Sequence, residues 1–264
     1  MREERCGRAE RAGRRPLGLR EVLRRPLPHL SLPDRLLLRG LLALLRDHVE
    51  RIEGLEHVAP ECDPFLLVLN HNQKYEVLAV PALLMFHRGG RLIHFLADWN
   101  YQLVPGVWWI YRRARVVRAS LKPAKPAWLN VFKPLLTDAE PAYSRAARLL
   151  AGGAPVGIFP EGRINRDPRR LLPGRPGAAR LSIEAGVPVV PAGIRFPGRD
   201  PASPIEDGAR MAVQLGPPME PPPPDRGERA SRRRVLEWHA AIMERIAELS
   251  GKAWTRRAPE RAVG

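Results

Sequence analysis

The amino-acid sequence predicts an α/β domain, and three observations support this prediction. Short apolar runs of strand length recur along the chain. Longer segments whose apolar residues have helical spacing lie between several of these runs. The length of 264 residues, with 44% hydrophobic and 27% charged residues, fits one large folded domain with appendages. A disordered or fibrous chain is therefore excluded.

The N-terminal part is predicted to be a basic flexible arm followed by an amphipathic helix. Residues 1–30 hold nine Arg and four Glu with few apolar side chains. Residues 31–53 predict the helix, because Ser31 and Asp34 resemble a capping box and Pro33 suits a first turn. Its apolar band is flanked by Arg35, Arg39, Arg46 and Arg51. Such a helix can contact a membrane interface or pack on its own domain, and the sequence leaves both alternatives open.

The central domain is expected to span residues 54–218. Its strands are predicted at Phe65–Leu69, Leu92–Leu96, Arg115–Val117, Val156–Phe159, Val189–Ile194 and Met211–Leu215. Helices are predicted at Val77–Phe86, Tyr143–Ala151 and Gly177–Ala185.

A proline-rich linker and a last helix are predicted to complete the chain. The linker is assigned to residues 219–230, since six of the eight residues 217–224 are proline. Residues 231–264 are assigned to an amphipathic helix and a tail, with the helix beginning near Ser231 and stopping at Gly251.

The charge of the chain indicates anionic partners. Lys and Arg number 44 and Asp and Glu 28, which gives a net charge of +16. Nucleic acid, phospholipid headgroups or a phosphorylated substrate would all fit. Nucleic acid is not expected, because zinc-finger spacing and an RRM signature are missing from the sequence. The sequence likewise offers no metal-ligand spacing and no Walker or Rossmann glycine loop, so neither a metal nor a permanently bound cofactor is expected.

The sequence also suggests a location. Met1–Arg25 is Arg-rich and lacks the apolar core of a secretory signal. The longest uncharged runs, such as Val77–Phe86, are far shorter than the roughly 18 apolar residues that span a bilayer. Two cysteines are too few for a disulfide scaffold or a Cys-based zinc site. A cytoplasmic protein without a transmembrane helix or signal peptide is therefore expected.

A polar run with one histidine follows the first predicted strand. It consists of Asn70, His71, Asn72, Gln73, Lys74, Tyr75 and Glu76. Open α/β sheets place their sites at such carboxyl ends of strands. Glu76 could hold one imidazole nitrogen of His71 while the other nitrogen accepts a proton, which would make His71 a general base. The alternative is an ordinary surface or helix-capping arrangement.

A second polar cluster follows the predicted strand Val156–Phe159. It consists of Pro160, Glu161, Gly162, Arg163, Ile164, Asn165, Arg166 and Asp167. Glycine permits a close approach of the backbone and guanidinium groups bind phosphate, so the cluster could form an anion pocket. Such residues are also common in solvated turns, and this segment alone does not determine a function.

Four motifs stand in a definite order along the chain. They are Asn70-His71 with an acid five residues after the His, Pro105-Gly106-Val107-Trp108 leading to Val116-Val117-Arg118, Phe159-Pro160-Glu161-Gly162, and Val187-Pro188-Val189-Val190-Pro191. In this order they resemble the motifs of the glycerolipid acyltransferases typified by lysophosphatidic-acid (1-acyl-sn-glycerol-3-phosphate) acyltransferase. The resemblance covers about residues 51–218 and implies a mixed, mostly parallel sheet flanked by helices.

The resemblance also implies an activity and its residues. It implies an O-acyltransferase that moves a fatty acyl group from acyl-CoA or acyl carrier protein to the hydroxyl of a lysophospholipid. His71 would be the general base and Glu76 would orient it, without an acyl-enzyme. The residues implied to hold the acceptor headgroup are Arg118, Glu161, Gly162, Arg163 and Arg166. Such substrates would place the protein peripherally on the anionic inner face of a membrane.

Two positions depart from the family pattern. Glu76 stands where the family usually has Asp, and Arg163-Ile164 stands where it most often has Thr-Arg. The first departure leaves open a catalytically weak or inactive member of the fold that acts as a membrane-associated lipid-binding protein.

Overall fold

The computed structural model describes residues 17–104, 106–119, 123, 126–138, 140–223 and 230–256. Within these ranges, seven strands form one sheet in the order β1–β7–β6–β2–β5–β3–β4. The strands are β1 (Val49–Glu53), β2 (Leu66–Leu69), β3 (His94–Asp98), β4 (Val117–Ala119), β5 (Val156–Ile158), β6 (Val189–Arg195) and β7 (Met211–Leu215). β6 and β7 pair antiparallel, whereas the other neighbours pair parallel. The predicted fold, an α/β domain with a mixed, mostly parallel sheet, is confirmed.

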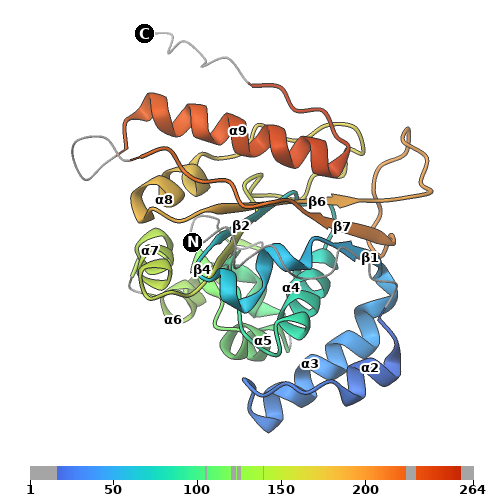
Figure 1. Cartoon of the computed structure of the whole chain (residues 1–264). Helices are drawn as coiled ribbons and strands as arrows, with labels where there is room; N and C mark the ends of the chain where they lie inside the picture. Colours follow the sequence, from blue (N-terminus) through green and yellow to red (C-terminus); the bar gives the residue numbers. More distant parts are fainter. Residues whose placement is uncertain are drawn as a thin grey trace.

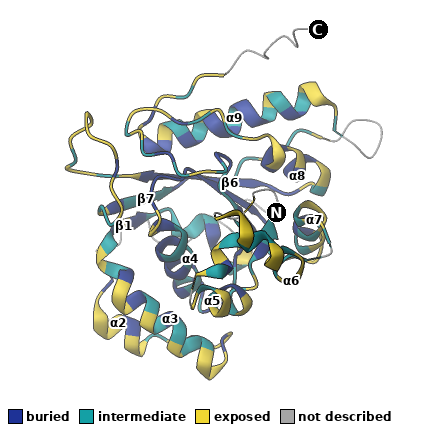
Figure 2. Cartoon of the chain, turned by 180° about the vertical axis from the view of Figure 1, so that it is seen from behind, coloured by how far each residue is buried: buried dark blue, intermediate teal, exposed yellow. Residues whose placement is uncertain are grey.

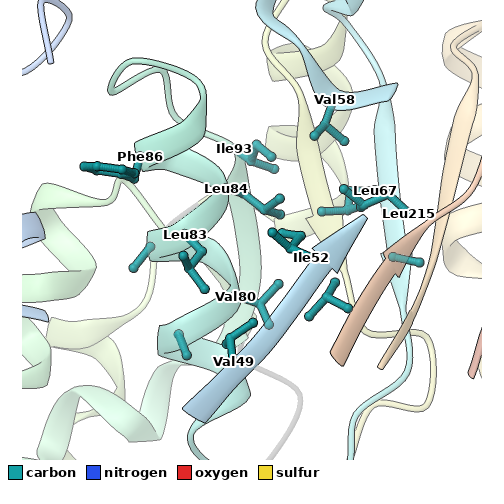
Figure 3. Packing of buried hydrophobic residues seen from close by; sticks show 14 of the residues in the cluster. Val49, Ile52, Val58, Leu67, Val80, Leu83, Leu84, Phe86, Ile93 and Leu215 are labelled. Carbon is teal, nitrogen blue, oxygen red and sulfur yellow. The ribbon is translucent and has the colours of Figure 1, made fainter. Parts of the chain in front are cut away.

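Helices cover both faces of this sheet (Figure 1). Leu66 and Val68 of β2 belong to the core beneath α7 (Ala142–Ala151), α8 (Gly177–Ala185) and α9 (Arg232–Ser250). Leu67 and Leu69 belong to the opposite core, against α4 (Glu76–His87). Successive side chains of a strand point to opposite faces, so a central strand covered on both sides is apolar throughout. Figure 3 shows Leu67 in this opposite core, on the side of Leu84 of α4.

The predicted helix over residues 31–53 is too long. Helix α3 covers Leu32–Leu45, a 3₁₀ turn covers Arg46–His48, and the remaining residues form β1. Val49 and Ile52 are buried as members of this strand, which lies beside β7 with Val49 opposite Met211. Their spacing also suits a helix, and the pairing with the distant strand β7 decides for the extended conformation.

The expected flexible arm is also partly wrong. Residues 1–16 lie outside the described residues, but the following residues include helix α2 (Leu19–Arg24). Val22 and Leu27 are buried in the same core as Leu38 and Leu42 of α3. The outer faces of α2 and α3 remain exposed (Figure 2). Helix α3 therefore packs on its own domain with one face and leaves large apolar side chains on the other, including Leu36.

The segment between β3 and α7 contains elements that the sequence did not predict. They are a 3₁₀ turn at Trp99–Leu103, helix α5 (Val107–Arg113), a 3₁₀ turn at Ala127–Phe132 and the short helix α6 (Lys133–Leu136). Further short 3₁₀ turns cover Leu55–Val58 and Pro60–Cys62. No helix in the described ranges is both long enough and apolar enough to cross a membrane.

The last helix, α9, matches its prediction at both ends. Ser231 is its N-cap and accepts a hydrogen bond from the backbone N–H of Arg234. Gly251 ends it with a φ of 70°, the left-handed conformation that glycine adopts without strain. Of the predicted linker, residues 224–229 lie outside the described part, as do residues 257–264 of the tail.

Candidate functional site

Two loops meet at one edge of the sheet. The segment 70–75 follows β2, and the segment 159–176 follows β5. These strands are parallel neighbours, with Leu66 opposite Val156, so their carboxyl ends lie together. The backbone N–H of Asn165 donates to the carbonyl oxygen of His71 over 2.7 Å, which joins the two loops directly.

His71 and Glu76 form a buried pair at this edge. The Nδ1 atom of His71 lies 2.6 Å from Oε1 of Glu76, the first residue of α4. Glu76 is fully buried, and both of its oxygens accept from Asn72, Oε1 from the backbone N–H and Oε2 from the side-chain amide. The longer side chain of Glu76 therefore reaches the imidazole, and Asn72 fixes the carboxylate in that position.

The geometry assigns different roles to the two imidazole nitrogens of His71. Because Glu76 contacts Nδ1, any proton exchange by this ring would use the other nitrogen, Nε2. The ring packs against Phe159, with 4.7 Å between ring centroids, and Phe159 in turn contacts Phe95. This packing and the contact with Glu76 together fix the orientation of the imidazole.

Glu161 is a second connection between the two loops. Its Oε1 accepts from the backbone N–H of His71 at 3.0 Å, and its Oε2 accepts from Asn165 Nδ2 and the backbone N–H of Leu172. Burial raises the pKa of the Glu161 carboxyl group, and these hydrogen bonds and the charge of Lys252 oppose that effect. In the structure, the Glu161 carboxylate thus binds protein N–H groups.

The remaining predicted substrate-binding residues lie farther out. Arg118 is in β4, on the same edge as His71 but three strands away, and its guanidinium lies 3.3 Å from Asp138. Arg163 is exposed, and it follows Gly162, which has a φ of 66°. Arg166 donates to the carbonyl oxygen of Ile205 and forms a 2.8 Å ion pair with Asp207.

The structure gives a role to Asn70, which the sequence placed in a motif without a function, and adds Lys252, which sequence reasoning missed. Asn70 binds the backbone of Ile194 in β6 through both its amide oxygen and its amide nitrogen, which holds the start of the loop. Lys252, beyond the end of α9, donates to Asn72 and to the carbonyl oxygen of Asp167. No sequence motif marks Lys252, because its partners lie far away along the chain. In the described part of the chain, no three His, Cys, Asp or Glu residues are grouped as a metal site.

Comparisons with known proteins agree with this geometry. A family model described as Acyltransferase matches residues 50–195. The 1-acyl-sn-glycerol-3-phosphate acyltransferase BAT2 of Brassica napus, a chloroplastic protein, is 28% identical over 141 residues, which are 53% of this chain. This chain spans only 35% of the length of that relative. The crystal structure of the 1-acyl-sn-glycerophosphate (LPA) acyltransferase PlsC from Thermotoga maritima shares the fold, with a TM-score of 0.53 and 19% identity over 89% of this chain and 88% of that one.

Proposed function

Because the chain belongs to the acyltransferase family, we propose that it is an O-acyltransferase acting on a lysophospholipid such as 1-acylglycerol-3-phosphate. The donor is a fatty acyl thioester of coenzyme A or acyl carrier protein. The observation that supports this proposal most directly is the 2.6 Å contact between His71 Nδ1 and Glu76 Oε1, at the carboxyl end of a buried strand. It creates a base whose second nitrogen can accept a proton.

His71 acts as the general base in the proposed reaction. The acceptor hydroxyl gives its proton to Nε2 while its oxygen attacks the carbonyl carbon of the thioester. The resulting imidazolium is stabilised by the Glu76 carboxylate through Nδ1–H. A positioned base of this kind contributes on the order of 10²–10⁴-fold to the rate.

The second half of the reaction uses the same imidazole. The tetrahedral intermediate collapses, the carbon–sulfur bond breaks, and the thiolate leaves with the proton from Nε2. His71 is then neutral again, and the acyl group is an ester of the acceptor. No covalent enzyme intermediate is required, since the acceptor hydroxyl attacks the thioester directly.

We assign the acceptor phosphate to Arg118 and Arg163, on the same edge as His71. Guanidinium groups bind phosphate bidentately; Arg163 is exposed, and Arg118 is partly exposed beside Asp138. Gly162 lets the backbone turn beside this position. Glu161 and Arg166 support the site indirectly, because their charged groups bind the loops that carry His71 and Asp207.

We further propose that the protein contacts an anionic membrane through an apolar surface. Large apolar side chains are exposed on α5 and on the segment from the 3₁₀ turn Ala127–Phe132 to α6. We call this set the aromatic rim: Trp108, Trp109, Trp128, Val131, Phe132 and Leu135. Arg112 lies over the ring of Trp108 and Arg113 over that of Trp109, at 4.9 and 5.4 Å. Tryptophan beside arginine suits the boundary between acyl chains and phosphates.

The aromatic rim is connected to the exposed face of α3. Arg113 of α5 forms a 2.8 Å ion pair with Asp34 of α3. Leu32, Leu36 and Leu44 of α3 are each more than 60% exposed. The two surfaces can therefore contact the same membrane.

The test is acyl transfer by purified protein, with acyl-CoA and acyl-carrier-protein donors and a panel of lysolipid acceptors, followed by lipid mass spectrometry. The wild type should form a product and His71→Ala should not. His29→Ala is the matched control, because His29 is exposed and lies outside the site. A folded wild type that binds liposomes and yields no product with any pair would instead identify an inactive lipid-binding protein.

A further inference from the structure

Lys252 is a buried cation that the proposed reaction does not use. Only 6% of the residue is exposed, although it lies in the C-terminal segment just after α9. Its Nζ atom donates to Oδ1 of Asn72 at 2.5 Å and to the carbonyl oxygen of Asp167 at 2.6 Å. Lysine is almost never this buried without specific partners, so these two oxygens account for its position.

The fold brings Lys252 into the site through two glycines. A Cβ atom on Gly193 of β6 would lie 2.2 Å from the backbone of Leu249, so only glycine lets the end of α9 approach the strand this closely. Gly251 then turns the chain, and the backbone N–H of Lys252 returns to the carbonyl oxygen of Ala247.

Ala253, the residue after Lys252, joins the C-terminal segment to the loop 159–176. The backbone N–H of Ala253 donates to the carbonyl oxygen of Arg169 at 2.7 Å, and its own carbonyl oxygen accepts from Leu171 at 2.9 Å. The C-terminal segment thus pairs with the loop that carries Asp167 and Glu161. Lys252 is held on both sides, by the end of α9 and by this pairing.

Lys252 also determines how the amide of Asn72 is oriented. Oδ1 of Asn72 accepts from Lys252 and from Asn70, which leaves Nδ2 to face Oε2 of Glu76 at 3.2 Å. If the amide rotated by half a turn, its oxygen would face the carboxylate and repel it. A continuous series of contacts therefore runs from Lys252 through Asn72 and Glu76 to His71.

The charges around Lys252 give it a second effect. The carboxylates that face it are Glu76 from α4 and Glu161 and Asp167 from the loop after β5. Glu76 and Glu161 are both buried, and both contact His71, at the ring and at the backbone. With Lys252 present, one positive charge balances one of these two negative charges in the resting site.

We propose that Lys252 is a positioning residue of the acyltransferase site: it orients Asn72, and thereby Glu76 and His71, and balances the buried carboxylates. This inference rests on the proposed function. It also makes the C-terminal segment around Lys252 a part of the catalytic apparatus, although the family match ends at residue 195.

The test compares Lys252→Met with Lys252→Arg and with the control Arg256→Met, an exposed arginine on the same segment. Lys252→Met should lower kcat roughly 10- to 100-fold, as expected for a base held in the wrong place, with a much smaller change in KM. Lys252→Arg should restore part of the rate, and Arg256→Met should match the wild type.

A second measurement is independent of activity. The His71 Nδ1–H that faces Glu76 should give a downfield proton NMR signal, assigned by its loss in His71→Ala. We expect this signal to shift or broaden in Lys252→Met and to persist in Arg256→Met. If Lys252→Met does not fold, Lys252→Gln, which keeps a donor and removes the charge, takes its place in both measurements.

The two proposals can fail separately. A wild type that transfers no acyl group overturns the proposed function, and the NMR signal still decides the role of Lys252. A folded Lys252→Met protein with the wild-type NMR signal shows that Lys252 does not position His71. In an active enzyme, an unchanged kcat of that variant leads to the same conclusion.

Discussion

The site around His71 and the aromatic rim differ in the surroundings of their side chains. At the site, His71, Asn72, Glu76, Glu161 and Lys252 are buried and hydrogen-bonded to one another or to the backbone. On the rim, large apolar side chains lie exposed to water. A buried polar network fixes geometry, whereas an exposed apolar surface gains free energy only when a partner covers it. We infer that the first region governs the chemical step and the second governs access to the lipid.

The largest effect should come from the carboxylate that orients the base. Glu76→Gln keeps the size of the side chain but removes the charge that stabilises the imidazolium, so kcat should fall by about 10²–10⁴-fold. The loss should be equal for a soluble short-chain acceptor and for acceptor presented in vesicles, because the change lies in the chemical step. Steady-state kinetics with both substrate forms measures this.

Glu76→Asp is the informative control for that experiment. It keeps the charge and restores the acid usual in the family, but shortens a side chain that here contacts both His71 and Asn72. We expect a loss smaller than that of Glu76→Gln. Wild-type rates in both variants would show that Glu76 does not act on His71.

The next largest effect should come from Arg118, which we assign to the acceptor phosphate. Arg118→Gln should raise KM for a phosphorylated acceptor roughly 10- to 100-fold, the range for a lost hydrogen bond to a charged group. KM for an acceptor without phosphate should change little. Arg148→Gln is the control, because Arg148 of α7 forms a surface ion pair with Glu140. An equal rise in KM for both acceptors would show that Arg118 only supports the fold through Asp138.

A substitution in the aromatic rim should weaken vesicle binding and leave the chemical step unchanged. Trp128 is 67% exposed, and Trp128→Ala should weaken binding to anionic vesicles about tenfold, since inserting part of a large apolar side chain yields about 1.5 kcal/mol. Activity toward a soluble acceptor should stay at the wild-type level. Vesicle co-sedimentation and the two assays together measure this, and equal losses in both assays would remove the distinction between the two regions.

The sequence predicts those structural features of the two regions that depend on the local pattern of residues. The strand β2, the loop with His71 and the helix α4 follow each other in one short segment, so their apolar and polar runs predict them correctly. The failures involve distant partners. Val49 and Ile52 form a strand only because β7 lies beside them, and Lys252 reaches Asn72 from 180 residues away. Periodicity within a segment contains no information about such contacts.

The smallest effect we predict concerns stability and a histidine outside both regions. His239 on α9 is buried, with Nε2 at 3.0 Å from the carbonyl oxygen of Pro173, and burial lowers its pKa below 6.5. The folded protein therefore favours the neutral ring. As the pH falls below about 6.5, the unfolded chain binds a proton that the folded chain does not, so stability is lost down to the folded-state pKa.

His239→Gln should reduce this loss, because glutamine can donate to Pro173 and does not titrate. The melting temperature of the variant should fall less than that of the wild type between about pH 7.5 and about pH 5.5. Glu161 acts in the opposite direction, since its raised pKa means that folding favours the protonated acid, but both proteins contain it and its effect cancels. Equal slopes of melting temperature against pH would show that His239 is not a source of acid sensitivity. A reduced slope with unchanged acyl transfer at neutral pH would show that His239 of α9 can be altered for stability independently of Lys252, which follows the helix.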